Sequence, residues 1–590
     1  MSQNPIFFLI KRQWLFAGKA RRDIIIYSAL FLLAHTFYFF EPLVIGRILN
    51  IIQNQGLNGG SVKTILPWLF LIIGLTIAFW LFHGPARVLE NKTAFLVRAN
   101  YKKYMLDGTM RLPSEWHTDH HSGDTIDKIN KASDALYFFC TETFMIIETV
   151  TKLLGSYLAL VYLNVHASYI VLIIVIVTIL MILRIDRTLI RQYEQLFRAE
   201  NTTSAKIFDV ISNITTVIIL RVEKLVSSAI FQKIMHPFRL FVKNNKINEV
   251  KWFLTSVLGS IMIFWVLLSF VYLNIQSGSA VMLGTVFILY EYVQRINNLF
   301  FRFAYKYGDL VLQKTALVNA EEISNEFSRK KRVKQFAFNR NWRLIEVRNL
   351  LFSYRKKDKE NANIDSISFS VRRGERIALI GASGSGKTTA LKLIRDLYHP
   401  KSVSVLLDGQ ELPHGFKSIS EEISLIPQDP EIFSTTIKEN ITLGARKDEA
   451  EILKYTDTAL FTPVIRRLPR GLRSSIVEKG VNLSGGEKQR LALARGLIAS
   501  EGKSIILLDE PTSSVDARNE LQIYKNIFDK FKDKAILSSI HRLHLLSLFD
   551  KVLLFKEGVI IASGSFNELL AASAEFKDMW EKYVQSQKKR

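Results

Sequence analysis

The residues from Gly381 to Thr389 follow the pattern G-x-x-x-x-G-K-[ST]. An apolar run at 376–380 precedes them and a helical pattern begins at Ala390, so the loop lies between a strand and a helix. Glycines allow successive backbone N–H groups to surround phosphate oxygens, and the helix start adds positive potential. The segment therefore predicts a nucleoside triphosphate site. Its expected phosphate-binding residues are Gly381, Ala382, Ser383, Gly384, Ser385, Gly386, Lys387, Thr388 and Thr389.

Two adjacent carboxylates follow a second buried-strand pattern. The run 504–508 is apolar and ends in Asp509 and Glu510. Ligands of α/β sheets bind at the carboxyl ends of the strands, which is where these side chains are expected. We expect Asp509, with the Thr388 hydroxyl, to hold Mg²⁺, and Glu510 to act as the general base that polarises the attacking water.

Other polar residues lie at the ends of further apolar runs. His541 follows the run 535–540 and is a candidate sensor of the γ-phosphate, and Gln428 follows the run 423–427. The segment Leu483-Ser-Gly-Gly precedes a helical pattern, so Ser484 is expected as a helix cap. Taken alone, this last segment has either that structural role or a role at the nucleotide.

The chain that positions these residues has two unlike halves. It has 590 residues, of which 48% are hydrophobic, and its net charge is +24. Residues 1–310 contain long apolar runs, whereas residues 342–590 have the pattern of a soluble α/β domain. The single cysteine, Cys140, excludes an intrachain disulfide and a cysteine-based zinc site.

Six apolar segments in the first half are candidate membrane spans, because about 20 helical residues cross a bilayer core. They lie at about 24–46, 64–82, 137–163, 169–183, 252–273 and 281–300. The short linkers 53–63, 164–168 and 274–280 contain one cation, Lys63, whereas the long linkers 86–136 and 184–251 contain many. This bias places both termini and both long linkers in the cytoplasm. It also explains much of the positive charge without a nucleic-acid partner.

The long linkers have helical periodicity, so the spans are expected to continue as helices into the cytosol and to turn back near residues 112–116 and 209–213. At the N-terminus, aromatic and cationic residues alternate between Pro5 and Lys19. This pattern predicts an amphipathic helix at the cytoplasmic membrane surface, in contact with anionic lipid.

Ionisable residues inside the predicted spans are candidate contacts for a transported molecule. Glu148 lies four residues before Lys152, and Glu291 lies four residues before Arg295. Such pairs either neutralise each other or mark a site inside the helix bundle, and the sequence favours neither alternative. Two further candidates are His35 and Glu41.

Taken together, these motifs resemble the nucleotide-binding domain of ABC ATPases. The residues that carry the resemblance are the phosphate loop, Gln428, Leu483-Ser-Gly-Gly486, Asp509-Glu510, Ser513-Ser-Val-Asp516 and His541. Six spans with two long cytoplasmic linkers ahead of that domain resemble an ABC exporter half-transporter of the type IV fold. The expected fold class is a six-span α-helical membrane domain with long cytoplasmic extensions, followed by an α/β P-loop ABC ATPase domain. The expected boundaries are 1–320 for the membrane domain, 321–341 for a linker and 342–590 for the nucleotide domain.

The resemblance implies further roles. Tyr354 would stack on adenine, and Gln428 would bind Mg²⁺ and couple it to the membrane domain. Ser484, Gly485 and Gly486 would close over the γ-phosphate held by a second subunit. Glu478 corresponds to the cross-talk loop of exporters and Asp516 to the D-loop carboxylate. The sequence departs from the family pattern at Glu487, where Gln is usual, at Val477, and in the segment Ser513–Asp516.

The resemblance thus implies an ATP hydrolase coupled to transport, with ATP and Mg²⁺ as cofactors. Its partner would be a second copy of itself or a related half-transporter, and it would lie in the plasma (inner) membrane. A drug or peptide exporter, a flippase for lipids or lipid-linked glycans, and an importer-like use of the fold remain open. A soluble ATPase acting on nucleic acid is disfavoured by the six spans. The cluster His117, His120 and His121 is either a metal site or part of a coupling elbow, and the elbow fits the resemblance better.

Overall fold

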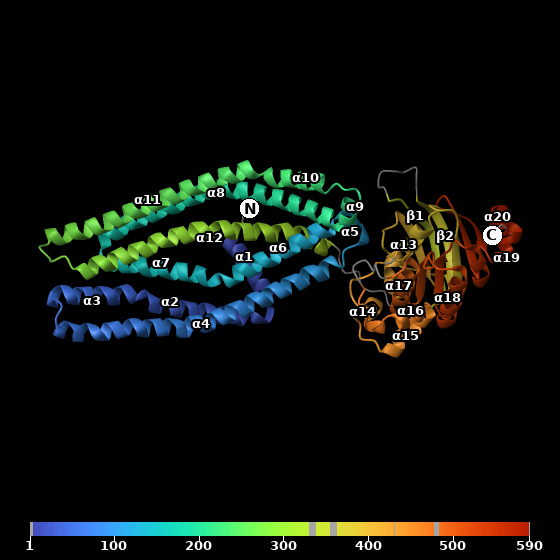
Figure 1. Cartoon of the computed structure of the whole chain (residues 1–590), viewed down its shortest axis with the longest axis horizontal. Coiled ribbons are helices and arrows are strands. Elements are labelled where there is room, and N and C mark those ends of the chain that lie inside the picture. Colours follow the sequence, from blue (N-terminus) through green and yellow to red (C-terminus); the bar gives the residue numbers. More distant parts are fainter. Residues whose placement is uncertain (1–3, 330–337, 355–362, 430, 477–482, 589–590) are drawn as a thin grey trace. The chain divides into compact units, whose positions relative to one another are not determined.

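The structure is a computed structural model that describes residues 4–329, 338–354, 363–429, 431–476 and 483–588. The chain divides into two compact units, Met1–Leu112 with Trp116–Lys331, and Pro113–Glu115 with Arg332–Arg590. The first is built from long helices and the second around two β-sheets (Figure 1).

The helical unit contains α1 to α12. Their bounds are α1 Pro5–Ala17, α2 Arg21–Phe39, α3 Glu41–Gln55, α4 Gly59–Thr109, α5 Ser114–Asp119, α6 Ser122–Thr141, α7 Thr143–Leu163, α8 Val165–Ser212, α9 Ile214–Ile219, α10 Glu223–Met235, α11 Phe238–Gln276 and α12 Leu283–Arg329. Helix α4 begins at a capping box, in which the Asn58 side chain accepts from the N–H groups of Gly60 and Ser61. Asn164 caps α8 in a similar way by accepting from the N–H of Ala167.

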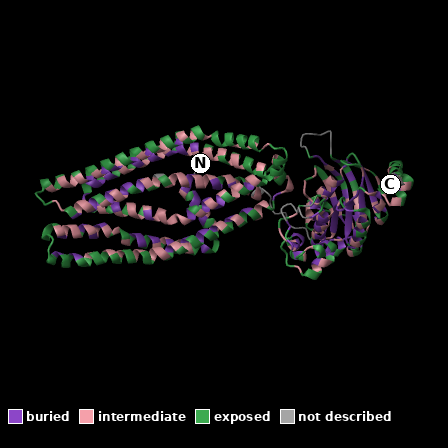
Figure 2. Ribbon diagram, in the orientation of Figure 1, coloured by how far each residue is buried: buried purple, intermediate pink, exposed green. Residues whose placement is uncertain are grey.

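Five helical segments are long and apolar enough to cross a membrane, among the residues that the structure describes. They are Pro5–Gln55, Gly59–Thr109, Ser122–Leu163, Val165–Ser212 and Glu223–Gln276, and they contain five of the six predicted spans. Large apolar side chains point outward from them, as at Tyr162, which is 90% exposed. Much of the helices' surface is exposed, whereas the strands of the second unit are largely buried (Figure 2). This distribution is expected of helices whose outer faces contact lipid rather than water.

The predicted spans differ from the helices in detail. The expected span 24–46 is divided at Phe40, between the end of α2 at Phe39 and the start of α3 at Glu41, and Pro42 lies in the first turn of α3. The expected span 137–163 is divided at Glu142, between α6 and α7. The sixth span, 281–300, lies in α12, which is not among the five apolar segments and stays a prediction.

The start of α12 is held tightly against α3. A Cβ atom on Gly284 would lie 1.9 Å from the Gly46 carbonyl oxygen, so only glycine allows this approach of the two backbones. The N–H of Gly284 donates to Asn50 Oδ1 at 2.8 Å, and the N–H of Leu283 donates to Gln53 Oε1 at 2.8 Å. Side chains of α3 therefore satisfy the first N–H groups of α12, which have no partner within their own helix.

In the part of the chain that the structure describes, the second unit contains α13 to α20 and β1 to β10. The strands are β1 Leu344–Phe352, β2 Ile364–Arg372, β3 Arg376–Ile380, β4 Ser402–Leu407, β5 Gln410–Glu411, β6 Ile423–Ile426, β7 Ile505–Asp509, β8 Ala535–Ser539, β9 Lys551–Lys556 and β10 Val559–Gly564. The helices are α13 Lys387–Ile394, α14 Ile437–Thr442, α15 Glu449–Thr458, α16 Thr462–Arg467, α17 Gly485–Ala499, α18 Ala517–Lys530, α19 Phe566–Ala572 and α20 Ala574–Lys588.

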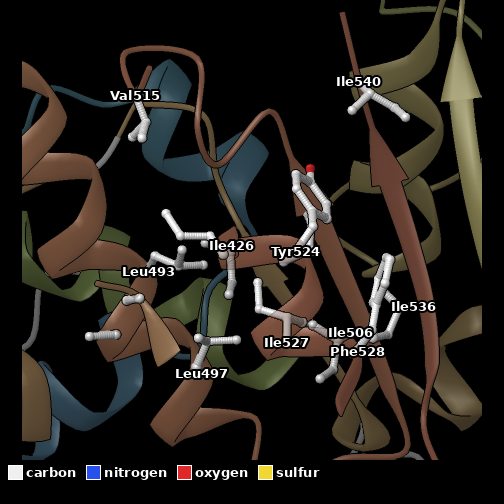
Figure 3. Close-up of a cluster of buried hydrophobic side chains, with 14 of the residues drawn as sticks. Ile426, Leu493, Leu497, Ile506, Val515, Tyr524, Ile527, Phe528, Ile536 and Ile540 are labelled. Carbon is white, nitrogen blue, oxygen red and sulfur yellow. The ribbon is translucent and has the colours of Figure 1, made fainter. Parts of the chain in front are cut away.

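The larger sheet positions the candidate site. Its strand order is β10-β9-β3-β8-β7-β6, and β9, β3, β8, β7 and β6 pair in parallel. The carboxyl ends of β3, β8 and β7 therefore meet at one edge, and each is followed by a predicted site residue. Beneath this edge, buried side chains from β7, β8, α17 and α18 pack together (Figure 3). Burial of these strands on both faces explains their continuous apolar sequences.

Candidate nucleotide site

The phosphate loop runs from the end of β3 to the start of α13, as predicted. Gly386 has φ = +107°, and a Cβ atom there would lie 2.8 Å from Ile364 Cδ1, so this turn requires glycine. The buried Lys387 side chain folds back over its own loop and donates from Nζ to the carbonyl oxygens of Gly381 at 2.9 Å and Ala382 at 3.0 Å. Burial lowers the pKa of Lys387, against the opposing effect of Glu510 and Asp509.

Thr388 and Asp509, two of the three predicted ligands of Mg²⁺, lie together. The Thr388 hydroxyl donates to Asp509 Oδ1 at 2.9 Å, which joins the start of α13 to the end of β7. Asp509 is 4% exposed, and burial raises its pKa although the Thr388 hydrogen bond lowers it. A hydroxyl and a carboxylate oxygen are ligands that Mg²⁺ prefers, so this pair fits the ion.

Glu510 lies between the other two predicted catalytic residues. Gln428 donates from Nε2 to Glu510 Oε2 at 2.8 Å, and His541 Nε2 lies 2.5 Å from Glu510 Oε1. Glu510 has φ = +45°, an uncommon conformation for a residue other than glycine. Such strain is maintained where the surrounding structure fixes it, frequently at functional sites. The fold thus brings together three residues that are separated by up to 113 positions in the sequence.

Tyr354 lies beside the end of the phosphate loop. Its hydroxyl oxygen is 3.4 Å from Thr389 Oγ1, and 46% of the residue's surface is exposed. Tyr398 packs edge-on against its ring, with 5.1 Å between ring centroids. The exposed ring is therefore available for stacking.

The signature segment forms the predicted helix cap. The Ser484 hydroxyl accepts from the N–H of Glu487 at 3.3 Å, and the N–H of Ser484 donates to Glu487 Oε2 at 2.8 Å. Arg467 pairs with the other carboxylate oxygen. Burial raises the pKa of Glu487, but these hydrogen bonds outweigh it and hold the pKa below its ordinary value. The unusual acid of the signature thus caps its own helix.

The structure does not bring the signature segment to the phosphate loop of the same chain. No hydrogen bond joins Ser484, Gly485 or Gly486 to residues 381–389 in the described part of the chain, although the two are parts of one unit. Gly486 instead packs against the loop after Glu510, where a Cβ atom would lie 2.8 Å from the Ser514 carbonyl oxygen. Asp516, at the end of that loop, caps α18 by accepting from the N–H of Asn519. Glu478 and Val477 lie outside the described residues.

Two residues with structural contacts at the site were missed by the sequence analysis. Gln489 donates to Ser513 Oγ at 2.7 Å and accepts from the N–H of Ser514 at 2.8 Å, so it ties α17 to the loop after Glu510. Buried Glu520 accepts from Thr512 Oγ1 at 2.7 Å and from Arg542 Nη1 at 3.0 Å. Both are polar side chains on the buried face of a helix. That position was the only signal in the sequence that could have indicated them.

In the helical unit, two of the three clustered histidines, His117 and His120, make local side-chain contacts. The His120 ring stacks on Trp116 with 4.2 Å between centroids, and its Nδ1 lies 2.8 Å from the Trp116 carbonyl oxygen. His117 Nε2 lies 3.1 Å from the Thr109 carbonyl oxygen.

Comparison with known proteins gives the class of this chain. Residues 24–297 match the family description "ABC transporter transmembrane region", and residues 364–513 match "ABC transporter". The chain therefore belongs to the ABC transporters and joins one membrane region to one nucleotide-binding domain, the arrangement of an exporter half-transporter. The ABC domain indicates that the chain binds ATP.

Individual relatives support this assignment. The chain is 35% identical over 237 residues to the glutathione/L-cysteine transport system protein CydD of Bacillus subtilis, and 34% identical over 239 residues to an ATP-dependent lipid A-core flippase of Haemophilus ducreyi. Each match covers 40% of this chain and 40% of the relative. The chain thus spans about two-fifths of the length of these curated relatives. A solved bacterial Atm1-family ABC exporter with ATP bound has the same fold, with a TM-score of 0.82, 21% identity and coverage of 95% of this chain and 99% of that chain.

Proposed function

We propose that this chain is an ATP-driven exporter that works as a dimer and moves a substrate from the cytosol or the inner leaflet to the outer side. The observation that carries the proposal is the Glu510 carboxylate, which is held by Gln428 and His541 at the sheet edge where the phosphate loop begins. This arrangement supports hydrolysis, and the long apolar helices supply the membrane path.

The residues at the sheet edge contact different parts of the nucleotide in this proposal. The Tyr354 ring stacks on adenine, and the backbone N–H groups of residues 381–389 surround the phosphates. The Lys387 ammonium leaves its two carbonyl partners for the β/γ-phosphate oxygens, where its charge has a stronger partner. Thr388, Asp509 and Gln428 would hold Mg²⁺, which would neutralise charge on the phosphate oxygens.

Glu510 then acts as the general base. One of its carboxylate oxygens exchanges its present hydrogen bond for one from the attacking water and accepts a proton from it. His541 contacts the γ-phosphate from the neighbouring strand end, and Gln428 keeps the second oxygen of Glu510 in place. The phosphate loop thus positions the nucleotide, and the ends of β7 and β8 position the water.

A second subunit completes each site in this proposal. The described chain has one phosphate loop and one signature segment, and no hydrogen bond between them. Ser484, Gly485 and Gly486 of one copy would therefore contact the γ-phosphate bound by the other. The favoured partner is a second identical copy, because Lys387, Gln428, Ser484, Glu510 and His541 are all present.

The dimer is tested by expressing this chain alone in nanodiscs and measuring hydrolysis of MgATP against its concentration. A homodimer is expected to hydrolyse ATP with a Hill coefficient above one. A monomer that gains activity only with a different subunit would contradict the homodimer and leave a heterodimer.

We further propose that both termini lie in the cytoplasm and that the membrane is the plasma (inner) membrane. In a Cys140→Ser background, cysteines introduced at Asn58 or Asn274 should react with an impermeant maleimide on intact cells. A cysteine at Asp124 should react only after lysis, and its labelling in intact cells would reverse the orientation. The domain boundaries at 320 and 342 also remain a prediction, since α12 continues through residue 320 to Arg329.

A flippase for lipids or lipid-linked glycans is the second candidate. It is supported by the similarity to a relative named as an ATP-dependent lipid A-core flippase. ATP hydrolysis in nanodiscs, measured against a panel of lipids, peptides and drugs, separates the two candidates by the class of compound that stimulates the rate.

A further inference from the structure

Two cavities inside the helical unit meet at one arginine. The first has a volume of about 590 Å³ and lies between α6, α7 and α12, with Ile6 of α1 at its wall. The second has a volume of about 370 Å³ and lies between α2, α3, α7 and α12. Arg302 lines both, so the two cavities adjoin at this side chain and one molecule could contact both. Both volumes lie within the range of about 300–1,000 Å³ that is typical of small-molecule sites.

The two cavities differ in chemistry. Most of the first is lined by aromatic and aliphatic side chains, among them Phe144, Met145, Phe303 and Leu310. The second is lined by five ionisable residues together with Asn298 and Tyr38. A molecule that fills both therefore has an apolar part and a charged part.

The charges where the cavities meet do not balance. Glu148 Oε1 contacts Lys152 Nζ at 2.6 Å and Arg302 Nη1 at 2.9 Å. One carboxylate thus serves two cations and leaves one positive charge in excess. The Arg302 side chain is 53% exposed, so its guanidinium has donors free to face the cavity. An anionic group of a ligand has a partner at this position.

The opposite imbalance occurs at Glu291, in the second cavity. The spacing of four residues would allow Glu291 and Arg295 to pair along α12. Arg295 instead contacts Glu41 Oε2 at 3.3 Å and donates to the Tyr38 carbonyl oxygen at 3.3 Å. Among the described residues, Glu291 has no ion-pair partner within 4 Å. An unpaired charge inside a predicted span is costly, so its presence there favours a functional contact. A cationic group is the ligand that this carboxylate prefers.

The side chains around Glu291 are fixed by other contacts. The Tyr38 ring has Lys152 Nζ at 4.7 Å and the Arg295 guanidinium carbon at 5.1 Å from its centroid. Tyr38 therefore separates the two cations and holds Arg295 toward α2 and α3. Because both basic neighbours are already engaged, Glu291 stays available.

We propose that this site binds a zwitterionic amphiphile as the transported substrate. Its apolar chain occupies the cavity of about 590 Å³, the anionic group of its head contacts Arg302, and the cationic group contacts Glu291. The proposal rests on the proposed export function and adds the class of its substrate. An anionic amphiphile would leave Glu291 unpaired, and a cationic amphiphile would leave the excess charge at Arg302.

The test uses four probes with the same twelve-carbon chain. Dodecylphosphocholine is zwitterionic, dodecyl phosphate is anionic, dodecyltrimethylammonium is cationic and dodecyl maltoside is uncharged. Binding of each radiolabelled probe to the full chain in nanodiscs is measured below its critical micelle concentration, without nucleotide and with EDTA. Protein-free nanodiscs give the background. The zwitterionic probe is expected to bind about ten- to hundredfold more tightly than the uncharged one.

Two substitutions separate the two halves of the head group. Glu291→Gln should weaken binding of dodecylphosphocholine about tenfold and leave binding of dodecyl phosphate unchanged. Arg302→Gln should weaken binding of both, and it leaves Glu148 paired with Lys152. Glu249→Gln and Arg191→Gln are matched controls on exposed positions outside both cavities. The thermal midpoint and the elution volume of each variant show whether it is folded.

Equal affinity for the zwitterionic and uncharged probes, or for the zwitterionic and anionic probes, would overturn the proposal. So would a folded Glu291→Gln variant with unchanged affinity for dodecylphosphocholine, or equally tight binding of glycerophosphocholine, which lacks the chain. Binding is measured without hydrolysis. Specific binding by a chain that does not hydrolyse ATP would therefore refute the proposed function alone, and hydrolysis without selective binding would refute this inference alone.

Discussion

The two units of this protein hold a buried lysine in different ways. In the nucleotide unit, the Lys387 ammonium is buried and held by two carbonyl oxygens, with no carboxylate in an ion pair with it among the described residues. In the helical unit, buried charges have ion partners, as in the contact of 3.1 Å between Lys251 Nζ and Asp186 Oδ1, whose side chains are 3% and 4% exposed.

This difference reflects what completes each unit. A cation held by neutral oxygens gains a stronger partner when a phosphate arrives, so the nucleotide unit is arranged for a ligand. A side chain buried between helices has no solvent to stabilise an isolated charge, so cations and anions pair within the bundle. This holds inside a predicted span, as at Glu148 and Lys152, and next to one, as at Asp186 and Lys251. A charge that breaks the rule of its own unit, such as Glu291, is therefore informative.

The largest effect is expected at Glu510 in the nucleotide unit, where the charged side chains take part in ATP hydrolysis. Glu510→Gln should lower the rate of ATP hydrolysis by about 10²–10⁴-fold, because the amide cannot accept the proton of the attacking water. Binding of a fluorescent ATP analogue should be unchanged, because the phosphate loop is intact. Steady-state hydrolysis and equilibrium binding in nanodiscs check both statements.

The matched control is Asp529→Asn, which removes a carboxylate that is largely exposed on the same unit. Its rate should equal that of the unmodified chain. If Glu510→Gln keeps more than half of the unmodified rate, Glu510 is not the general base.

The next effect concerns the self-paired charges of the helical unit. Asp186→Asn removes the buried carboxylate that contacts Lys251 Nζ at 3.1 Å and should destabilise the protein by about 3–5 kcal/mol. The double variant Asp186→Asn/Lys251→Met removes both charges and should recover much of that loss. The thermal midpoints of the purified variants in the same nanodiscs give the comparison. A double variant less stable than Asp186→Asn would show that the pair does not act through mutual neutralisation.

A smaller effect is expected at the signature helix. Glu487→Ala removes the acceptor for the Ser484 N–H and the partner of Arg467, and it should destabilise the protein by about 1 kcal/mol. Glu487→Gln keeps one acceptor oxygen and should cost less. The thermal midpoint of each full-length variant measures this change in stability. Equal midpoints for the Ala variant and the unmodified chain would exclude the cap as a stabilising contact.

The smallest effect is a shift in pH dependence. Burial lowers the pKa of Lys387, so its ammonium loses a proton at lower pH than an exposed lysine does. The charge that binds phosphate is present below that pKa and lost above it. The pH dependence of kcat/KM reports the free enzyme. The apparent pKa at which kcat/KM decreases at alkaline pH should therefore lie below that of an ordinary lysine, whereas the apparent pKa for kcat should not. Equal apparent pKa values for kcat/KM and kcat would contradict the role of Lys387 in binding phosphate.

The nucleotide site was largely predictable from the sequence because each predicted residue follows an apolar strand. The parallel order of β3, β8 and β7 then places Lys387, His541 and Glu510 at one edge. Gln489 and Glu520 were not predicted, because a polar residue on a buried helix face has no fixed spacing from its partners. Their contacts depend on how α17 and α18 pack, which no local pattern encodes.

The helical unit was predictable in length and hydropathy but not in its pairing. The break at Phe40 allows Glu41 to meet Arg295, which lies 254 positions later in the sequence. The spacing of four between Glu291 and Arg295 favours a pair along one helix, but the packing of α3 on α12 provides another carboxylate. Which carboxylate pairs with Arg295 depends on contacts between helices that are distant in the sequence, and only the fold shows these contacts.

The meeting of Gly46 and Gly284 has a mechanical consequence. The backbones of the two helices approach closely at these glycines, with Ile288 packed against Gly46 and Asn50 against Gly284, so the contact can act as a pivot. With Asn50 and Gln53 holding the first residues of α12, a small tilt of that helix about the pivot would move its far end most. Such a tilt would leave the contact between Gly46 and Gly284 in place and change the distance between Arg302 and the opposite walls of the two cavities.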